Sequence, residues 1–389
     1  MKKQYLNVAS VGMDVHHKFS TVVMRDGKGD VLCRERLDHV GRSLLRRRLT
    51  GWPKRVPYVM EASFGWMWLS DEMVAKGLKV NLANCFKLEQ MRKARGESKT
   101  NGKDAALLSE LPFEARQWWR VWLAPAEVRN EREWLRLRMD LVKLQTQTKN
   151  RINAIFHRYG IFHEFSDLFG SKGRGLLVHL CQYGRTDEVE LPDGALAALR
   201  SHVRLLGQVR TRLAEVTRKI RVRLERTDLA RRLDGIPGFG EVLSHTVIAE
   251  VGRIERFRNH RALASYSLLA PISMDTGESS GKAPLGRHLG HRGNRTLKWA
   301  FIEAAHGAVR SGGRWRAMYD RHTDGGRRNK NQGYIKVARS LVKVVYAVWS
   351  KGVDYTPSAP SPARRKRRAK SRRSRSGKGQ PFQPMAAVR

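Results

Sequence analysis

Short apolar runs separated by turns dominate the first hundred residues. Val8–Val11 and Phe19–Met24 are β-rich, and the second run ends at the turn Asp26-Gly27, which predicts a hairpin. Three further strands are predicted at 31–37, 56–62 and 79–83, with a helix at 66–76 that Gly77 closes. The alternation of strands and helices predicts one α/β domain over residues 1–110.

Residues 111–232 carry two long helical patterns after a cluster of tryptophans at 118–122 that favours packing over stacking on bases. In both patterns, apolar residues recur at steps of three and four, as in the seam of a coiled coil. The first seam comprises Trp134, Leu137, Leu141, Leu144, Thr148, Ile152 and Ile155, and the second comprises Leu196, Leu199, Val203, Leu206, Val209, Leu213, Val216, Ile220 and Leu224. We therefore expect a helical coiled-coil linker whose two helices pair within one chain or between chains.

The remaining chain is predicted to be a mostly helical domain over residues 233–354 and a disordered basic tail over residues 355–389. The segment LDGIPGFGEVLSHTVIAEVG places Gly238 and Gly240 between two helix patterns. It resembles a helix-hairpin-helix, in which glycines let backbone N–H groups approach a phosphate; a tight helix–helix turn is the alternative. The tail is rich in Pro, Ser and Arg and has no apolar periodicity.

The charge balance indicates a polyanionic partner. The 389 residues carry 76 Lys and Arg against 36 Asp and Glu, a formal net charge of +40. This excess is far beyond what solubility requires, and it predicts binding to nucleic acid. No apolar run approaches the roughly 18 residues of a membrane-spanning helix, and the first residues lack the apolar segment of a signal peptide. We expect no membrane partner and a cytoplasmic, nucleoid-associated bacterial protein.

The three cysteines, Cys33, Cys85 and Cys181, are far apart and show no metal-binding spacing. The acids are more informative. Asp14 lies on the first predicted strand, Glu61 ends a later strand, and Asp104 shares a helix face with Asn101. Carboxylates from different parts of the chain are what two divalent ions need in order to clamp the oxygens of a phosphodiester, as at an RNase H-like site.

The order of the motifs GMDVHH, VMEAS and SKTNGKDA resembles the RuvC-like domain of insertion-sequence transposases of the "one hundred and ten" family, the DEDD recombinases. The resemblance implies an RNase H-like (RuvC-like) fold in which Asp14, Glu61 and Asp104 bind Mg²⁺ or Mn²⁺. The third acid of the family pattern is Asn101 here. An amide oxygen can still coordinate Mg²⁺, but it brings no negative charge.

The segment from Ala270 to Ala305 resembles the C-terminal domain of the same transposases, with its Ser-Gly, Gly-Arg and Arg-Gly-Asn motifs. In that family a serine of this loop becomes covalently joined to DNA. The matching position is Ser280, with Ser279 as the alternative register. The nucleic-acid-binding residues that the resemblance and the basic composition indicate are Gly238, Gly240, Lys282, Arg287, Arg292, Arg295 and Lys298.

The resemblance implies a DNA transposase that cuts and rejoins DNA through a serine–DNA linkage. It also implies guidance by a structured noncoding RNA and a homodimeric or tetrameric complex. Two alternatives remain open at this point. One is a RuvC-like junction nuclease that uses water as the nucleophile, and the other is a nucleic-acid-binding protein that has lost catalysis through the Asn101 substitution.

Overall fold

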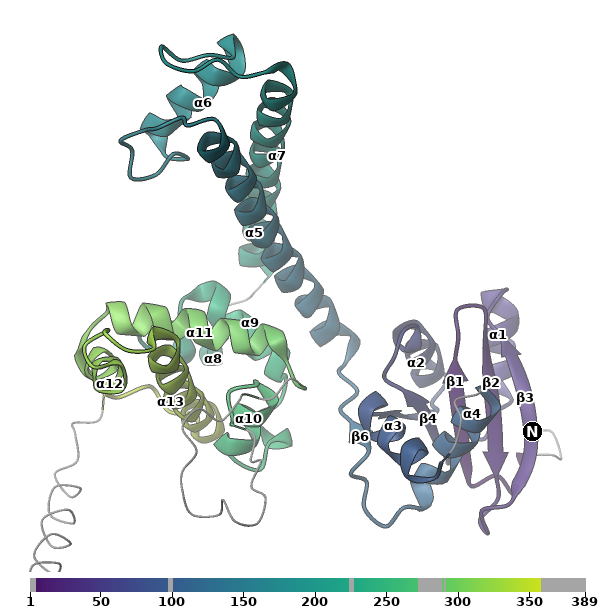
Figure 1. Ribbon diagram of the computed structural model, residues 1–389. Helices are drawn as coiled ribbons and strands as arrows, with labels where there is room; N and C mark the ends of the chain where they lie inside the picture. The colour runs from purple at the N-terminus through teal and green to yellow at the C-terminus, as the bar shows by residue number, and fades with distance from the viewer. Residues whose placement is uncertain (1–4, 97–100, 224–226, 272–288, 290–291, 358–389) are drawn as a thin grey trace, which may run out of the picture. The chain divides into compact units, whose positions relative to one another are not determined.

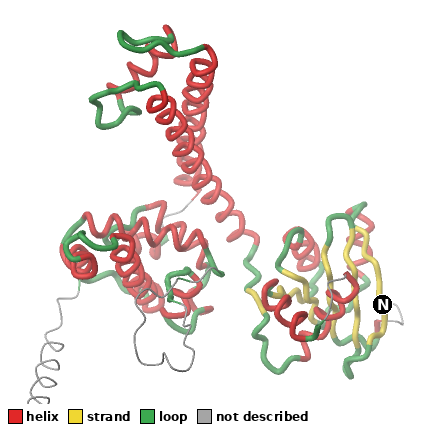
Figure 2. The backbone as a smooth tube through the Cα atoms, viewed as in Figure 1, coloured by secondary structure: helices red, strands yellow, loops and turns green. Residues whose placement is uncertain are grey.

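The computed structural model describes residues 5–96, 101–223, 227–271, 289 and 292–357. The chain forms two compact units, residues 1–130 and residues 131–389, which are described separately below. Among the described residues, every strand belongs to the first unit and the second unit is helical (Figure 2). The expected α/β start and mostly helical remainder are therefore confirmed. A search of the described helices finds none long and apolar enough to cross a membrane.

The first unit is built on a six-stranded sheet with the order β3-β2-β1-β4-β5-β6 (Figure 1). The strands are β1 (Ser10–Val15), β2 (Phe19–Arg25), β3 (Val31–Asp38), β4 (Pro57–Glu61), β5 (Lys79–Ala83) and β6 (Arg120–Val121). Strands β1 to β3 form an antiparallel meander, whereas β4 is parallel to β1 and β5 is parallel to β4. Strand β1 is central and buried along its whole length, so its side chains face the interior on both sides of the sheet.

Two apolar cores cover the two faces of this sheet. The helices are α1 (Arg42–Thr50), α2 (Trp66–Ala75), α3 (Cys85–Ala94) and α4 (Asn101–Glu110). Met13 and Met60 share one core with residues of α1 and α2. Val59 shares the other with Leu88 of α3 and Leu107 of α4. Trp119 belongs to this second core, and β6 pairs with β5, so the first unit continues beyond residue 110.

The second unit contains a pair of long helices and a helical C-terminal core. Helix α5 (Ala126–Arg158) begins in the first unit and continues into the second, and α6 (Ser171–Tyr183) and α7 (Asp193–Arg223) follow. Apolar residues of α5 and α7 share two clusters, which also include residues of α6 and of the C-terminal core, so the two helices pair within one chain (Figure 1). The expected seam is wrong at Leu137, which is 45% exposed, because Leu135 takes the buried position.

The C-terminal core packs around α11 and α13. Its helices are α8 (Asp228–Asp234), α9 (Glu241–Val251), α10 (His260–Tyr266), α11 (Arg295–Arg310), α12 (Gly313–Thr323) and α13 (Lys330–Lys351), with a short 3₁₀ turn, η3 (Ile254–Arg256), after α9. Leu297 and Phe301 of α11 and Leu341 and Val345 of α13 are fully buried in it. Cys33, Cys85 and Cys181 are free thiols, and all three are half-buried.

Candidate active site

The register of the sheet brings Asp14 and Glu61 to the same level. In the parallel pairing of β1 with β4, Met13 lies opposite Met60. The next residue on each strand is an acid, and the carboxyl ends of neighbouring parallel strands meet at one edge of a sheet. Asp14 is buried and Glu61 is half-buried. The two carboxylates predicted from strand positions are therefore neighbours.

Helix α4 brings the third acid to the same place because Gly12 lets it approach β1 closely. A side chain at position 12 would place its Cβ 2.1 Å from the carbonyl oxygen of Ala105 and 2.3 Å from the amide nitrogen of Ser109. Gly12 and Asp14 are two residues apart on a strand and so share the face that α4 covers. Asp104 directly precedes the contact residue Ala105, and it is buried.

A buried arginine holds Asp104. Arg92 Nη1 donates hydrogen bonds to both carboxylate oxygens of Asp104, at 2.8 and 3.1 Å. The two side chains are only 10% and 9% exposed. Arg92 lies on α3, one helical turn after buried Leu88 and on the same face. A cation from α3 thus compensates one member of the acidic cluster.

Asp14 has no comparable cation. Burial raises the pKa of Asp14 above its usual value, and the charges of Asp104 and Glu61 raise it further. His16 opposes this rise, since its Nε2 lies 3.0 Å from Asp14 Oδ2. That approach is not aligned as a hydrogen bond, because the buried Nε2 has no partner that meets hydrogen-bond geometry. The site therefore holds like charges close together with incomplete compensation.

This donor set suits a hard divalent cation. Asp104 and Glu61 make it harder to charge buried Asp14, and the imidazole nitrogen beside it has no hydrogen bond, so a positive ion at this place would stabilise the ionised Asp14. In the described part of the chain, no group of three or more His, Cys, Asp or Glu side chains is already arranged to hold such an ion. Asp104 faces Arg92 instead, so metal binding would require this carboxylate to turn from the guanidinium. Asn101 begins α4, three residues before Asp104.

Four predicted site residues, Ser279, Ser280, Lys282 and Arg287, lie outside the described residues. The next continuously described segment begins at Arg292. Within it, Asn294 caps α11 by accepting a hydrogen bond from the amide of Leu297 at 2.9 Å. Arg292 and Arg295 are exposed and Lys298 is half-buried. These three cations therefore gather where α11 begins.

The two glycines between α8 and α9 have different surroundings. Gly238 has a φ of +91°, and a Cβ there would lie 2.0 Å from the carbonyl oxygen of Ala304, so it serves the close packing of this turn on α11. Gly240, by contrast, has open space where a side chain would lie. Ala304 is nine residues beyond Arg295, about 13 Å along the helix. The glycine turn and the cations at the start of α11 are thus separate features.

Sequence reasoning missed Arg92 and His16. Arg92 falls in a basic segment, residues 87–95, to which we assigned no role, and it lies four residues after apolar Leu88, on the same helix face. His16 lies two residues after Asp14, so strand periodicity places both side chains on one face.

Two family models match the chain. One, for DEDD transposases of the IS110 type, covers residues 11–161, and the other, "Transposase IS116/IS110/IS902 family", covers residues 230–320. The chain belongs to the IS110 family of transposases. The IS110-type match includes Asp14, Glu61 and Asp104, and membership implies an enzyme that processes DNA.

Two similar proteins come from Streptomyces insertion elements. The chain is 26% identical over 306 residues to the uncharacterized 44.8 kDa protein of insertion element IS116 from Streptomyces clavuligerus, which covers 68% of this chain and 75% of that protein. It is also 26% identical over 305 residues to the 43.6 kDa protein of insertion element IS110 from Streptomyces coelicolor, covering 68% and 74%. A 42 kDa protein of insertion element IS900 from Mycobacterium paratuberculosis is 24% identical over 69% of this chain and 76% of that protein.

Proposed function

We propose that this IS110-family transposase is a metal-dependent DNA recombinase. The observation that carries the proposal is that buried Asp14 and Asp104 and half-buried Glu61, which come from two adjacent parallel strands and one helix packed on them, interact electrostatically. Asp14, Glu61, Asn101 and Asp104 would hold Mg²⁺ or Mn²⁺ within an RNase H-like domain. The bound ions would stabilise charge on the attacking and leaving oxygens of a phosphodiester.

The proposed nucleophile is the hydroxyl of Ser280, with Ser279 as the alternative. Its oxygen would form a bond to phosphorus as a deoxyribose oxygen leaves, and the hydroxyl proton would be lost during attack. The result is a serine–DNA ester that a second DNA hydroxyl can resolve. In this proposal, the metal ligands are residues of the first unit and the nucleophile is a residue of the second. Gly238, Gly240, Lys282, Arg287, Arg292, Arg295 and Lys298 would hold nucleic acid, with the glycine turn acting as a helix-hairpin-helix.

Two partners complete the proposal. A structured noncoding RNA would guide the choice of DNA, and the active complex would be a homodimer or tetramer. The net charge of +40 supports binding to nucleic acid, because Lys and Arg that neutralise phosphates release bound counterions.

Denaturing electrophoresis with end-labelled donor DNA, Mg²⁺ and the RNA copied from the element's own end tests the chemistry. We expect a labelled DNA–protein adduct that Asp14→Asn and Ser280→Ala abolish and Ser279→Ala retains. Peptide mapping of the adduct identifies the attacking residue. Efficient Mg²⁺-dependent cutting without an adduct would instead assign the chemistry to water and favour a junction nuclease. Nucleic-acid binding with neither cutting nor adduct would identify a protein that has lost catalysis.

A further inference from the structure

A basic pocket lies in the second unit, between α10, α12 and α13. Its volume is about 450 Å³, within the range of roughly 300–1,000 Å³ typical of ligand sites. Among the described residues, none of those that line it is acidic. The cationic and titratable residues are His260, Arg261, His322, Lys336, Arg339 and Lys343.

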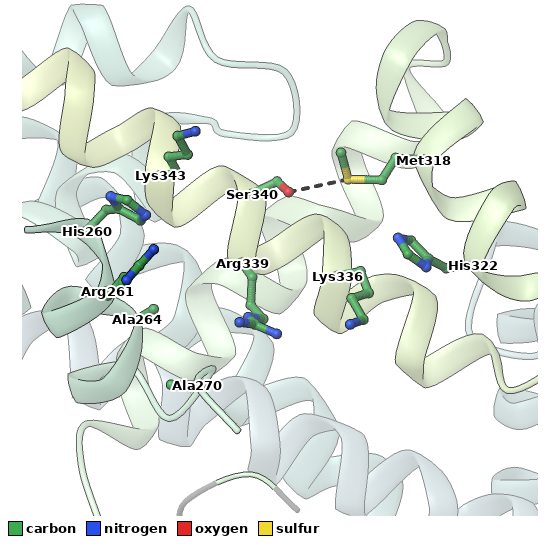
Figure 3. Close-up of a pocket in the computed structure, with 10 residues that line it drawn as sticks. All are labelled: His260, Arg261, Ala264, Ala270, Met318, His322, Lys336, Arg339, Ser340 and Lys343. Carbon is green, nitrogen blue, oxygen red and sulfur yellow. Dashed lines mark hydrogen bonds between the residues drawn. The ribbon is translucent and has the colours of Figure 1, made fainter. Parts of the chain in front are cut away.

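The pocket owes its charge to the pattern of α13. Lys336, Arg339 and Lys343 are spaced by three and four residues and share one helix face, while Val337, Leu341 and Val345 bury the opposite face in the core. Figure 3 shows the three cations projecting from successive turns of α13, with His260 and Arg261 on one side and His322 on the other.

Within the described residues, Arg261, Lys336, Arg339 and Lys343 take part in no ion pair. Burial lowers the pKa of His322, and the positive charges of Lys336 and Arg321 lower it further. Held together without acids, such charges repel one another, and a bound anion removes that cost.

Spacing identifies the class of anion. Lys336 and Lys343 are seven residues apart on one helix, a rise of about 10 Å. A single phosphate ion cannot contact both ends of such a row, whereas a nucleic-acid strand presents a charge about every 3.4 Å along its axis. Ala264, Ala270 and Met318 add apolar surface to the wall, which suits sugar and base contact.

We propose that this pocket binds the phosphate backbone of a nucleic-acid strand. The site adds to the proposed function and rests on it. Lys336, Arg339 and Lys343 lie beyond both family-model matches, the second of which ends at residue 320. The pocket is also distinct from the cations at the start of α11, because it is lined by α10, α12 and α13.

The test compares two triple variants of the full-length protein that remove the same net charge. One is Lys336→Gln, Arg339→Gln and Lys343→Gln. The control is Arg253→Gln, Arg258→Gln and Arg310→Gln, at three exposed cations of the same unit that do not line the pocket. Fluorescence anisotropy in EDTA measures affinity for labelled single-stranded DNA, duplex DNA and an RNA hairpin over a salt series.

We expect the pocket variant to lose about tenfold or more in affinity for at least one of the three nucleic acids, and the control to lose clearly less. The log–log salt slope should fall by about 2 for a single strand or about 3 for a duplex, since three contacts are removed. The nucleic acid whose affinity falls most is the type that the pocket binds. Thermal melts monitor folding, and single Lys336→Gln and Lys343→Gln variants, both at exposed positions, replace the triple variant if it unfolds.

Equal losses in the two variants would overturn the proposal, because net charge alone would then explain binding. Unchanged affinity in the pocket variant would also overturn it. Loss of inorganic phosphate binding with intact nucleic-acid affinity would identify a small-anion site instead. The assay contains no divalent metal and measures no chemistry. Failure of the proposed recombinase function would therefore appear separately, as a missing adduct with binding intact.

Discussion

Each unit contains a buried carboxylate, and the two differ in the groups that surround them. In the second unit, Glu250 is 1% exposed and saturated with donors: Arg136 donates to both carboxylate oxygens, at 2.8 and 3.0 Å, and Asn294 donates to one of them at 2.7 Å. In the first unit, Asp14 has other carboxylates as neighbours and one poorly aligned histidine. A buried acid with its full set of donors has a structural role, whereas one surrounded by acids is arranged for a cation that comes from outside the fold.

The difference also shows in what each acid connects. Arg132 donates to the backbone carbonyls of Ala249 and Glu250, at 2.8 and 3.0 Å, so two arginines of α5 hold the end of α9. Asn294, the cap of α11, completes the group. Glu250 thereby ties α5, α9 and the start of α11 together. At the acidic site of the first unit, the pair of Arg92 on α3 with Asp104 on α4 links two helices.

The largest effect is expected at Glu250. Glu250→Ala leaves Arg132 and Arg136 without their carboxylate, and removing one partner of a buried ion pair costs about 3–5 kcal/mol. Calorimetry should show a clearly lower melting temperature for the second unit. The exposed Glu303→Ala on α11 is the control and should change stability by about 0.5 kcal/mol or less. Equal stability of Glu250→Ala and wild type would make the contrast between the two sites invalid.

A smaller loss is expected at Arg92, and divalent metal should reverse it. Arg92→Gln leaves buried Asp104 without its cation, at a cost of about 1–3 kcal/mol in EDTA. Because the acids then lack internal compensation, Mg²⁺ should raise the melting temperature of the variant more than that of wild type. Exposed Arg95→Gln, which pairs with Glu110, serves as the control. If Mg²⁺ raises the melting temperature of the variant no more than that of wild type, the acids do not bind the metal.

Asp14→Asn should act in the opposite direction on stability. The pKa of Asp14 is raised in the folded protein, so the ionised side chain destabilises the fold above that pKa, and the penalty disappears as pH falls below 3.8, where the acid is protonated in both states. In EDTA at pH 7 the variant should therefore be more stable than wild type. Denaturant melts over a pH series from 7 downward check this, with the gain in stability expected to shrink as pH falls. A loss of stability at pH 7 would make Asp14 a structural acid like Glu250.

The smallest effect is expected at Asn101. Asn101→Asp adds a negative charge to the proposed ligand set, so the Mg²⁺ concentration for half-maximal adduct formation should fall severalfold. Titrating Mg²⁺ in the adduct assay measures the shift, and Asn101→Ala, which removes the amide oxygen, should move the requirement upward. An unchanged or higher requirement in Asn101→Asp would indicate that the site is adapted to the amide.

Local patterns in the sequence were sufficient for some elements of the fold, whereas helices such as α1 and α6 were not predicted. The strand at 79–83 and the helix starting at Trp66 agree with β5 and α2, because apolar periodicity and a closing glycine act within a few residues. Periodicity failed at Leu137. A seam defined by spacing alone does not say which of two adjacent residues faces the partner, and the packing of α5 on α7 placed Leu135 inside.

The acids Asp14, Glu61 and Asp104 were identified from motif order, and charge composition alone indicated a nucleic-acid partner. Only tertiary structure decided what compensates those acids. The pairing of Arg92 with Asp104, the saturation of Glu250 by residues from α5 and α11, and the pocket between α10, α12 and α13 all join residues distant in the chain. A buried charge is stabilised by whatever donors the packed fold brings within about 3 Å. The sequence specifies those donors but not the packing that brings them together.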